Sequence, residues 1–159
     1  MASEEKNQSN IINSELNLNY NKYLFADKPI NRFKTKPKVE DISTKLDELR
    51  NEIEKIENCE LKKNASKIVF SDGNNRSKIM IVGEGPGQKE DQEGKPFVGD
   101  AGLLLNKMLK SINIERKNVY ITNVVNYRPP NNRKPEPVEI TKYSNFLRKH
   151  ISIIDPKIL

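Results

Sequence analysis

Apolar residues first take on a regular spacing near residue 41. From there they recur alternately four and three residues apart, which predicts one face of an amphipathic helix, at Ile42, Leu46, Leu49, Ile53 and Ile56. A stripe of this kind could also form a coiled-coil seam, but it covers only about two heptads and Leu61 breaks its spacing. We therefore expect the helix to pack on its own domain.

Uninterrupted apolar runs further along predict buried strands that alternate with helices. Ile68–Phe70 predicts a short strand closed by a turn at 71–74, and Ile79–Val82 has the composition of a strand buried on both faces. From this second strand onward the predicted order is strand, helix, strand, helix and strand, over residues 79–82, 101–112, 118–125, 137–154 and 156–159. This order is typical of a parallel α/β sheet covered by helices on both faces, a three-layer αβα architecture.

The pattern also divides the chain into two parts. Residues 1–40 are rich in Asn, Ser, Lys and Glu and have few apolar positions, so they are predicted to be a flexible polar segment, with a short helix around Leu16–Phe25. Residues 41–159 are predicted to form the α/β domain. Two full strands and the beginning of a third are few for such a domain, and we expect it to be incomplete at its C-terminus.

Composition changes this picture only in part. Lys and Arg outnumber Asp and Glu by 28 to 22, which gives a net charge of +6 and suits a polyanionic partner, although an AT-rich genome produces the same lysine-rich composition. The single cysteine, Cys59, excludes a disulfide within the chain and indicates a reducing, cytoplasmic location. The sequence contains no apolar run of signal-peptide or membrane-spanning length.

Candidate chemistry begins in the glycine-rich stretch VGEGPGQKEDQEGKPFVGDAG at residues 82–102. Its first glycines are arranged as G-x-G-x-G, which differs from the G-x-G-x-x-G of dinucleotide-binding proteins, and no Gly-Lys-Ser/Thr follows as in a P-loop. A nucleotide-binding α/β protein is therefore the weakest of the functional interpretations. A solvated acidic turn around a core phenylalanine, Phe97, is the plainest one.

Three observations favour a ligand site over such a turn. Glu84 closely follows a predicted buried strand, and ligands of parallel sheets bind at the carboxyl ends of the strands. The glycines around it allow the backbone to approach a bound group closely. Asn123 places a polar side chain inside the apolar run ITNVV of the next strand. The acidic residues Glu90 and Asp91 belong to the same loop as Glu84.

These motifs resemble a known family. GEGPGQKEDQEGKPFVGDAGLLL, followed by VYITNVV and RPPNNRKPEPVEI, is similar in order and separation to the family 4 uracil-DNA glycosylases of the uracil-DNA glycosylase superfamily, whose relatives include phage-type DNA-polymerase-related proteins. The resemblance covers about residues 41–159. It implies the N-terminal portion of a uracil-DNA glycosylase-like fold, a role in base excision repair, and hydrolysis of the N-glycosidic bond of uracil in DNA.

The resemblance also implies roles for individual side chains. Glu84 would organise the water or the charge at the glycosidic bond, and Asn132 would support catalysis from the second loop. Phe97 would stack on the flipped uracil, Asn123 would hydrogen-bond its edge, and Glu90 would lie near C5 and exclude a thymine methyl group. Basic side chains of the second loop are candidates for DNA-backbone contacts, or for an ordinary solvated loop: Arg128, Arg133 and Lys134.

The sequence departs from the family at its cofactor. Many members bind a [4Fe–4S] cluster through four cysteines, but here Cys59 matches one ligand position and the others are Ile56, Tyr127 and Tyr143. One thiolate cannot hold a cluster, so we expect no cofactor and no metal. We expect Cys59 to be a small buried residue instead.

A second departure concerns the C-terminal histidine motif of the family, which this chain does not contain. Its single histidine, His150, is expected at the surface or at a helix end. A truncated chain is expected to be an impaired enzyme. The alternatives are a non-catalytic remnant or DNA-binding fragment of a split glycosylase gene, and a subunit that a second chain completes.

Overall fold

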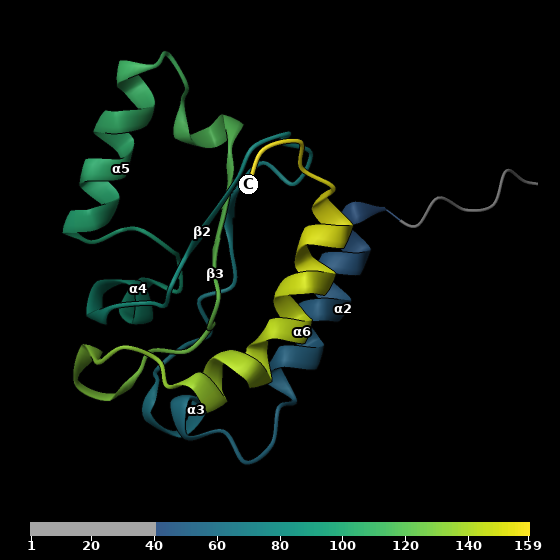
Figure 1. Ribbon diagram of the computed structural model, residues 1–159, viewed down its shortest axis with the longest axis vertical. Helices are drawn as coiled ribbons and strands as arrows, with labels where there is room; N and C mark the ends of the chain where they lie inside the picture. Colours follow the sequence, from purple (N-terminus) through teal and green to yellow (C-terminus); the bar gives the residue numbers. More distant parts are fainter. Residues whose placement is uncertain (1–40) are drawn as a thin grey trace, which may run out of the picture. The chain divides into compact units, whose positions relative to one another are not determined.

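The computed structural model describes residues 41–159 (Figure 1). The predictions for residues 1–40 lie outside the described residues. In the described part the helices are α2 (Ile42–Glu54), α3 (Glu60–Asn64), α4 (Gln88–Glu93), α5 (Asp100–Ser111) and α6 (Pro137–Ile154), with short 3-10 turns η1 (Arg116–Asn118) and η2 (Pro130–Asn132). The three long helices confirm the predicted ones. The two short helices, α3 and α4, contain too few residues to produce a periodic pattern.

The sheet is small and mixed. Strand β2 (Met80–Gly83) pairs in parallel with β3 (Tyr120–Asn123), and β1 (Asp72–Gly73) pairs antiparallel with the other side of β3. A parallel bridge between Ile79 and Ile158 places the chain's last residues beside β2. The predicted α/β class and the parallel β2–β3 pair are confirmed, and the antiparallel edge strand is an addition to them.

The strand predicted at Ile68–Phe70 is wrong, because no strand is formed there and β1 lies inside the predicted turn. The backbone of this segment is paired in another way. The Val69 N–H donates to the Asn126 carbonyl at 2.8 Å, and the Asn126 Nδ2 donates to the Val69 carbonyl at 3.1 Å. Asn126 therefore takes the place of a second strand residue through its backbone carbonyl and its side-chain amide, and the apolar run is buried without a ladder.

Helices cover both faces of the sheet, as Figure 1 shows with α5 on one side of β2 and β3 and with α2 and α6 together on the other. Side chains of neighbouring strand residues point to opposite faces. Met80 and Tyr120 accordingly belong to the core formed with α2 and α6, whereas Ile81 and Ile121 belong to the core formed with α5. The three-layer αβα arrangement follows from this alternation.

Helix α2 packs on its own domain, as predicted. Its buried residues Leu46, Leu49 and Ile53 lie in the same apolar core as Tyr143 and Ile154 of α6. Within residues 41–159, none of the helices combines the length and the apolar character that a membrane-spanning helix needs.

The expectation that His150 lies at the surface or at a helix end is wrong. Its side chain is 2% exposed, its ring stacks on Phe70 with centroids 4.6 Å apart, and its Nε2 shares a hydrogen bond with the Tyr120 hydroxyl. His150 follows Tyr143 by seven residues and precedes Ile154 by four, so it lies on the buried stripe of α6. Burial lowers the pKa of His150 to about 4.

Candidate functional site

A cavity of about 300 Å³ lies where β2 and β3 end. It forms there because Gly83 and Asn123, the last residues of the two parallel strands, are partners in the sheet. Its lining comes from these strand ends, from the loop that contains α4, and from the beginning of α5: Gly83, Glu84, Gly85, Gly87, Glu90, Phe97, Gly99, Asp100, Ala101 and Asn123. A crevice at the carboxyl ends of parallel strands is the usual place for a ligand in this class of fold.

Asn123 and Phe97 approach each other across Gly83. A Cβ atom at Gly83 would lie 2.4 Å from the Asn123 Oδ1 and 2.7 Å from two ring carbons of Phe97. Only glycine leaves room for both side chains at this point. A planar aromatic ring and a primary amide therefore face the same small cavity.

The Asn123 amide is buried and incompletely paired. Its side chain is 3% exposed, and its Nδ2 has no hydrogen-bond partner among the described residues. Such a group costs about 1–3 kcal/mol when it stays unpaired. A buried donor without a partner at the wall of a cavity is what a site for a polar ligand requires.

Phe97 has an unusual backbone conformation, because its φ of 53° lies in the left-handed region that a bulky residue rarely adopts. Backbone outliers of this kind cost about 1–3 kcal/mol and persist only where the surroundings hold them. One such support is Gly102 of α5, where a Cβ atom would lie 1.9 Å from the Phe97 carbonyl oxygen. The ring is therefore placed by its backbone, and α5 packs against that backbone.

The carboxylate of Glu90 is used inside the loop. Its Oε1 accepts hydrogen bonds from the N–H groups of Val98 and Gly99, at 3.0 and 2.8 Å, and its Oε2 accepts from the Gly87 N–H at 3.1 Å. Burial raises the pKa of Glu90, but these N–H donors outweigh burial and the pKa is lowered overall. Glu90 therefore stays charged and connects the two ends of the loop that forms the cavity wall.

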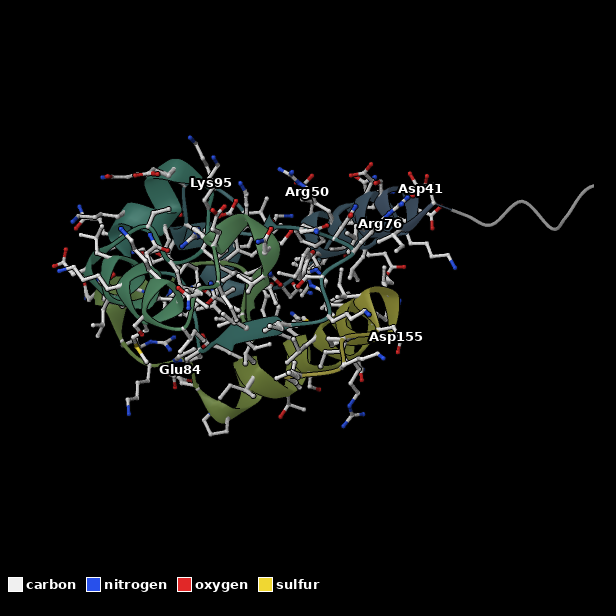
Figure 2. The ribbon with its side chains drawn as sticks, turned by 90° about the horizontal axis from the view of Figure 1, so that it is seen from above. Asp41, Arg50, Arg76, Glu84, Lys95 and Asp155 are labelled. Carbon is white, nitrogen blue, oxygen red and sulfur yellow. The ribbon has the colours of Figure 1, made fainter. Side chains whose placement is uncertain are left out.

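The other carboxylates of this region differ in their pairing. Asp100 forms an ion pair with Lys89 at 3.1 Å, and the buried Asp91 accepts hydrogen bonds from the backbone of residues 66 and 67, at 2.8 and 3.2 Å. Glu84 lines the cavity, is exposed, and has no hydrogen-bond or ion-pair partner among the described residues; Figure 2 shows it at the edge of the molecule. Of the cavity's carboxylates, Glu84 is the one that is free to act on a ligand.

Asn132 does not line this cavity. It lies in η2, is exposed, and accepts a 2.7 Å hydrogen bond from the Nε of Arg128 on its Oδ1. Its loop nevertheless approaches the cavity, because a Cβ atom at Gly85 would lie 3.5 Å from Pro135 and 3.9 Å from Pro129. The structure thus brings together Glu84, Glu90, Phe97 and Asn123 and places Asn132 on the neighbouring loop.

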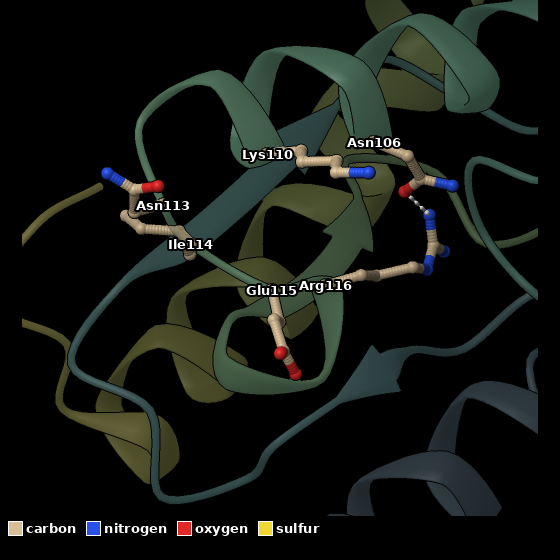
Figure 3. A pocket seen from close by; sticks show the side chains of 6 residues that line it. All are labelled: Asn106, Lys110, Asn113, Ile114, Glu115 and Arg116. Atoms are coloured by element: carbon tan, nitrogen blue, oxygen red, sulfur yellow. Dashed lines mark hydrogen bonds between the residues drawn. The ribbon is translucent and has the colours of Figure 1, made fainter.

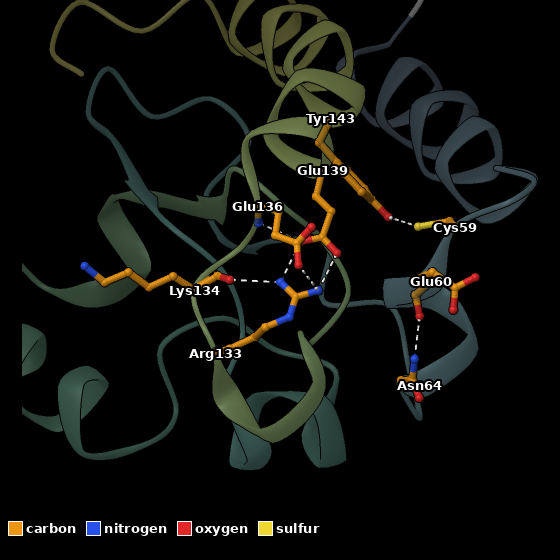
Figure 4. A network of polar contacts seen from close by, with 8 residues as sticks. All are labelled: Cys59, Glu60, Asn64, Arg133, Lys134, Glu136, Glu139 and Tyr143. Atoms are coloured by element: carbon orange, nitrogen blue, oxygen red, sulfur yellow. Dashed lines mark hydrogen bonds and ion pairs between the residues drawn. The ribbon is translucent and has the colours of Figure 1, made fainter.

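Two of the basic residues considered for DNA contacts are already engaged within the chain. Arg128 donates to the side chain of Asn132. Arg133 forms a bidentate pair with Glu139, drawn in Figure 4, with distances of 2.7 and 2.8 Å. The Arg133 guanidinium lowers the pKa of the Glu139 carboxyl. The pair connects the second loop to the first turn of α6, so the first role of Arg133 is to hold the loop in place.

The four positions matched to cluster ligands gather in one apolar core. Cys59, Tyr127 and Tyr143 are buried there and Ile56 packs against them. The Cys59 Sγ lies 3.3 Å from the Tyr143 hydroxyl (Figure 4). A [4Fe–4S] cluster needs four thiolates, and these residues supply one thiolate, two phenols and a hydrocarbon, so they do not fit the group. Cys59 is buried, as predicted.

We predict that the purified chain contains no stoichiometric iron or sulfide. The reason is the donor chemistry: burial raises the pKa of Tyr143 and so keeps its phenol protonated and unsuited to ligation. Iron and acid-labile sulfide are measured on protein isolated without air, with Cys59→Ala as the control. About four irons per chain that disappear in the control would contradict the prediction.

Sequence reasoning missed Arg116, whose guanidinium reaches the carbonyls of Pro96 and Phe97 next to the cavity. Nothing in the run NIERKNVYI distinguishes it from a solvated arginine. It also missed the structural use of Glu90. A Glu three residues after Gly87 is a capping pattern, and this spacing could have indicated that role.

Comparisons with known proteins point in the same direction as the motifs. The family model described as the uracil DNA glycosylase superfamily matches residues 70–159. The chain is 45% identical over 114 residues to a type-4 uracil-DNA glycosylase of Archaeoglobus fulgidus. These aligned residues make up 72% of this chain and 57% of that protein. To the type-4 uracil-DNA glycosylase of Sulfurisphaera tokodaii it is 48% identical over 115 residues, or 72% of this chain and 52% of that protein.

A DNA polymerase of Bacillus phage SP01 is also similar, with 36% identity over 88 residues, which cover 55% of this chain and 10% of the phage protein. This match agrees with the phage-type relatives expected from the motifs. The chain spans about half the length of the two type-4 relatives.

Proposed function

The chain belongs to the uracil-DNA glycosylase superfamily, and from this premise we propose that it is a DNA base-excision repair protein that hydrolyses the N-glycosidic bond of uracil in DNA. The target nucleotide would leave the base stack and enter the cavity at the ends of β2 and β3. In the reaction the bond between C1′ and the base nitrogen breaks, its electron pair leaves with uracil, and a water oxygen bonds to C1′ and loses a proton that the departing uracil takes up.

The observation that carries the proposal is the Nδ2 of Asn123, which has no hydrogen-bond partner within residues 41–159. The uracil edge offers a carbonyl acceptor, O4, next to an N–H donor, N3. A primary amide supplies one donor and one acceptor side by side, which matches that pair.

Phe97 and Glu90 complete the proposed base site. The Phe97 ring would stack on the face of the flipped base, an interaction worth about 1–3 kcal/mol. Glu90 would exclude the thymine methyl group. Its three backbone hydrogen bonds support this role, because a side chain held at both oxygens cannot move aside for a methyl group.

Glu84 and Asn132 are the proposed catalytic residues. A free carboxylate next to C1′ would orient the attacking water and stabilise the positive charge that develops on the sugar. This role is supported by the lack of a described partner for Glu84, in contrast to Glu90 and Asp100. Asn132 would act from the neighbouring loop, whose Pro129 and Pro135 approach the cavity at Gly85.

The proposal includes a DNA partner and a cytoplasmic location. The net charge of +6 supports attraction to phosphates, and the lone cysteine fits a reducing compartment. Lys134 is exposed and contributes to a basic loop beside the cavity. Completion of the site by a second chain remains part of the proposal. It is tested by measuring whether the specific activity rises with the concentration of this chain.

The test uses the 159-residue chain and a single-stranded oligonucleotide with one uracil. Excision is measured as strand scission at the abasic site after alkali treatment, and binding as fluorescence anisotropy. Glu84→Ala is expected to lower the excision rate roughly fivefold, since a solvent-exposed charge about 4 Å from the reacting centre contributes about 1 kcal/mol. Glu93→Ala, an exposed carboxylate of α4 outside the cavity, is the matched control.

Each outcome decides between the interpretations. Excision that requires Glu84 supports the interpretation that the chain is an enzyme. Preferential binding of the uracil oligonucleotide over its thymine counterpart, without excision, supports the alternative of a DNA-binding fragment. If the chain shows neither excision nor preferential binding, both interpretations are excluded.

A further inference from the structure

The guanidinium of Arg116 connects its own turn, η1, to three other parts of the molecule. Its Nε donates to Asp72 of β1 at 2.7 Å, and its Nη2 donates to the Pro96 carbonyl at 2.7 Å. Its Nη1 donates to the Phe97 carbonyl at 2.9 Å and to the Asn106 Oδ1 of α5 at 3.1 Å. Figure 3 shows the contact with Asn106, across a pocket that is separate from the candidate site.

These contacts converge on the strained backbone of Phe97. Two successive carbonyl oxygens, those of Pro96 and Phe97, are held by one planar group, and the second belongs to the residue with φ of 53°. Gly102 of α5 packs against the same carbonyl. The backbone that aims the Phe97 ring at Gly83 and Asn123 is therefore held by Arg116 and by the close approach of α5.

Arg116 itself takes no part in the cavity. It is absent from the lining, and its side chain is 22% exposed, with its nitrogens turned to Asp72, Asn106 and the two carbonyls. An effect of Arg116 on the cavity can therefore act only through the segment that it holds. The rigid, planar set of donors of a guanidinium suits this task. A lysine ammonium is a single point charge and cannot reproduce the same set of hydrogen bonds.

We propose that Arg116 is a positioning residue that sets the Phe97 ring for stacking on the bound base, and so determines the affinity of the cavity for its base. This inference rests on the proposed function, because it takes the Phe97 ring as the stacking surface. Loss of the guanidinium frees the two carbonyls, and the Phe97 backbone relaxes out of the left-handed region. The ring then no longer closes the cavity opposite Asn123.

The first test is a double-mutant cycle on binding of the uracil oligonucleotide. Arg116→Gln and Phe97→Ala are each expected to weaken binding about tenfold, as expected for loss of one stacked base. The double variant is expected to bind like Phe97→Ala alone, because Arg116 has nothing left to position. Additive losses in the double variant would overturn the proposal. Arg116→Lys keeps the charge beside Asp72 and provides a second variant if Arg116→Gln does not fold.

The second test needs no substrate. The chain contains no tryptophan, so Phe97→Trp introduces a single fluorophore at the position in question. Adding Arg116→Lys to this reporter is expected to shift its emission to longer wavelength and to increase its quenching by acrylamide. Lys149→Gln, which removes an ion pair with Glu52 between α6 and α2, is the matched control and is expected to change neither.

The two tests separate the inference from the proposed function. A wild-type chain without preference for uracil would contradict the proposed function, whereas the tryptophan emission still reports whether Arg116 places the ring. If the wild-type chain prefers uracil but Arg116→Lys leaves the emission of the tryptophan reporter unchanged, the inference is contradicted and the proposed function is not.

Discussion

Replacement of Asn123 by alanine is expected to reduce uracil recognition roughly 100-fold and to leave the folded protein as stable as the wild type. The loss in kcat/KM corresponds to two hydrogen bonds to the base, at about 1.5 kcal/mol each. The unchanged stability follows from the Nδ2 that has no partner among the described residues, since removal of an unpaired buried donor offsets the small void that is created.

Asn126 offers a matched control three residues further along. It is buried to the same extent, 3% exposed for both, but its amide donates to the Val69 carbonyl. Asn126→Ala is therefore expected to lower the free energy of unfolding by about 1–3 kcal/mol and to leave uracil recognition unchanged in the folded protein. Urea unfolding and excision kinetics of both variants provide the comparison. If Asn123→Ala destabilises the fold as much as Asn126→Ala does, Asn123 is an ordinary core residue.

Acidification from pH 7.5 to pH 4 is expected to remove about 3 kcal/mol of stability through His150 alone. Its pKa is about 4 in the folded chain and 6.5 in an unpaired histidine, so the unfolded chain binds the extra proton between these values. Stability due to this group is therefore complete above pH 6.5 and falls as the pH drops toward 4. Two and a half pKa units correspond to about 3.4 kcal/mol at about 1.4 kcal/mol per unit, and about 3 kcal/mol of this is lost by pH 4, where the folded His150 is half protonated.

The surroundings of His150 explain why it resists protonation. The stacked Phe70 ring offers no charge, and burial raises the pKa of Tyr120, so the Tyr120 hydroxyl that shares a hydrogen bond with the His150 Nε2 stays neutral. Free energies of unfolding in urea at several pH values measure the effect. His150→Phe serves as the control, because it keeps an aromatic ring in the stack and removes the titrating group. The difference between the two proteins isolates His150 from the carboxylates, and parallel curves would refute the assignment.

Periodicity and apolar runs determined the elements that this fold shares with any α/β domain. The spacing of four and three at 42–56 and the proline before 138 predicted α2 and α6, and the buried runs predicted β2 and β3. The position of the cavity followed as well, because the carboxyl ends of parallel strands meet at one edge. Motifs and strand order were enough to place Glu84, Glu90, Phe97 and Asn123 near one another.

What these side chains do was decided by contacts between residues distant in the sequence. Glu90 is held by N–H groups eight and nine residues away, and Phe97 by an arginine nineteen residues away. The spacing of Gly87 and Glu90 indicates only the third of the Glu90 contacts, and the contact of Arg116 with Phe97 leaves no local pattern. The contacts of His150 with Phe70 and Tyr120 also join residues distant in the sequence, although its position on the buried stripe of α6 is a local signal.

The sequence by itself therefore determined which residues stand at the edge of the sheet, because local spacing decides the strands and the helices. Only the tertiary structure decided which of the carboxylates is free, which amide donor is unpaired, and which arginine holds the aromatic ring. The physical reason is that hydrogen-bond partners are satisfied in space and not along the chain. A polar side chain becomes available for chemistry only after its neighbours in the fold have found other partners.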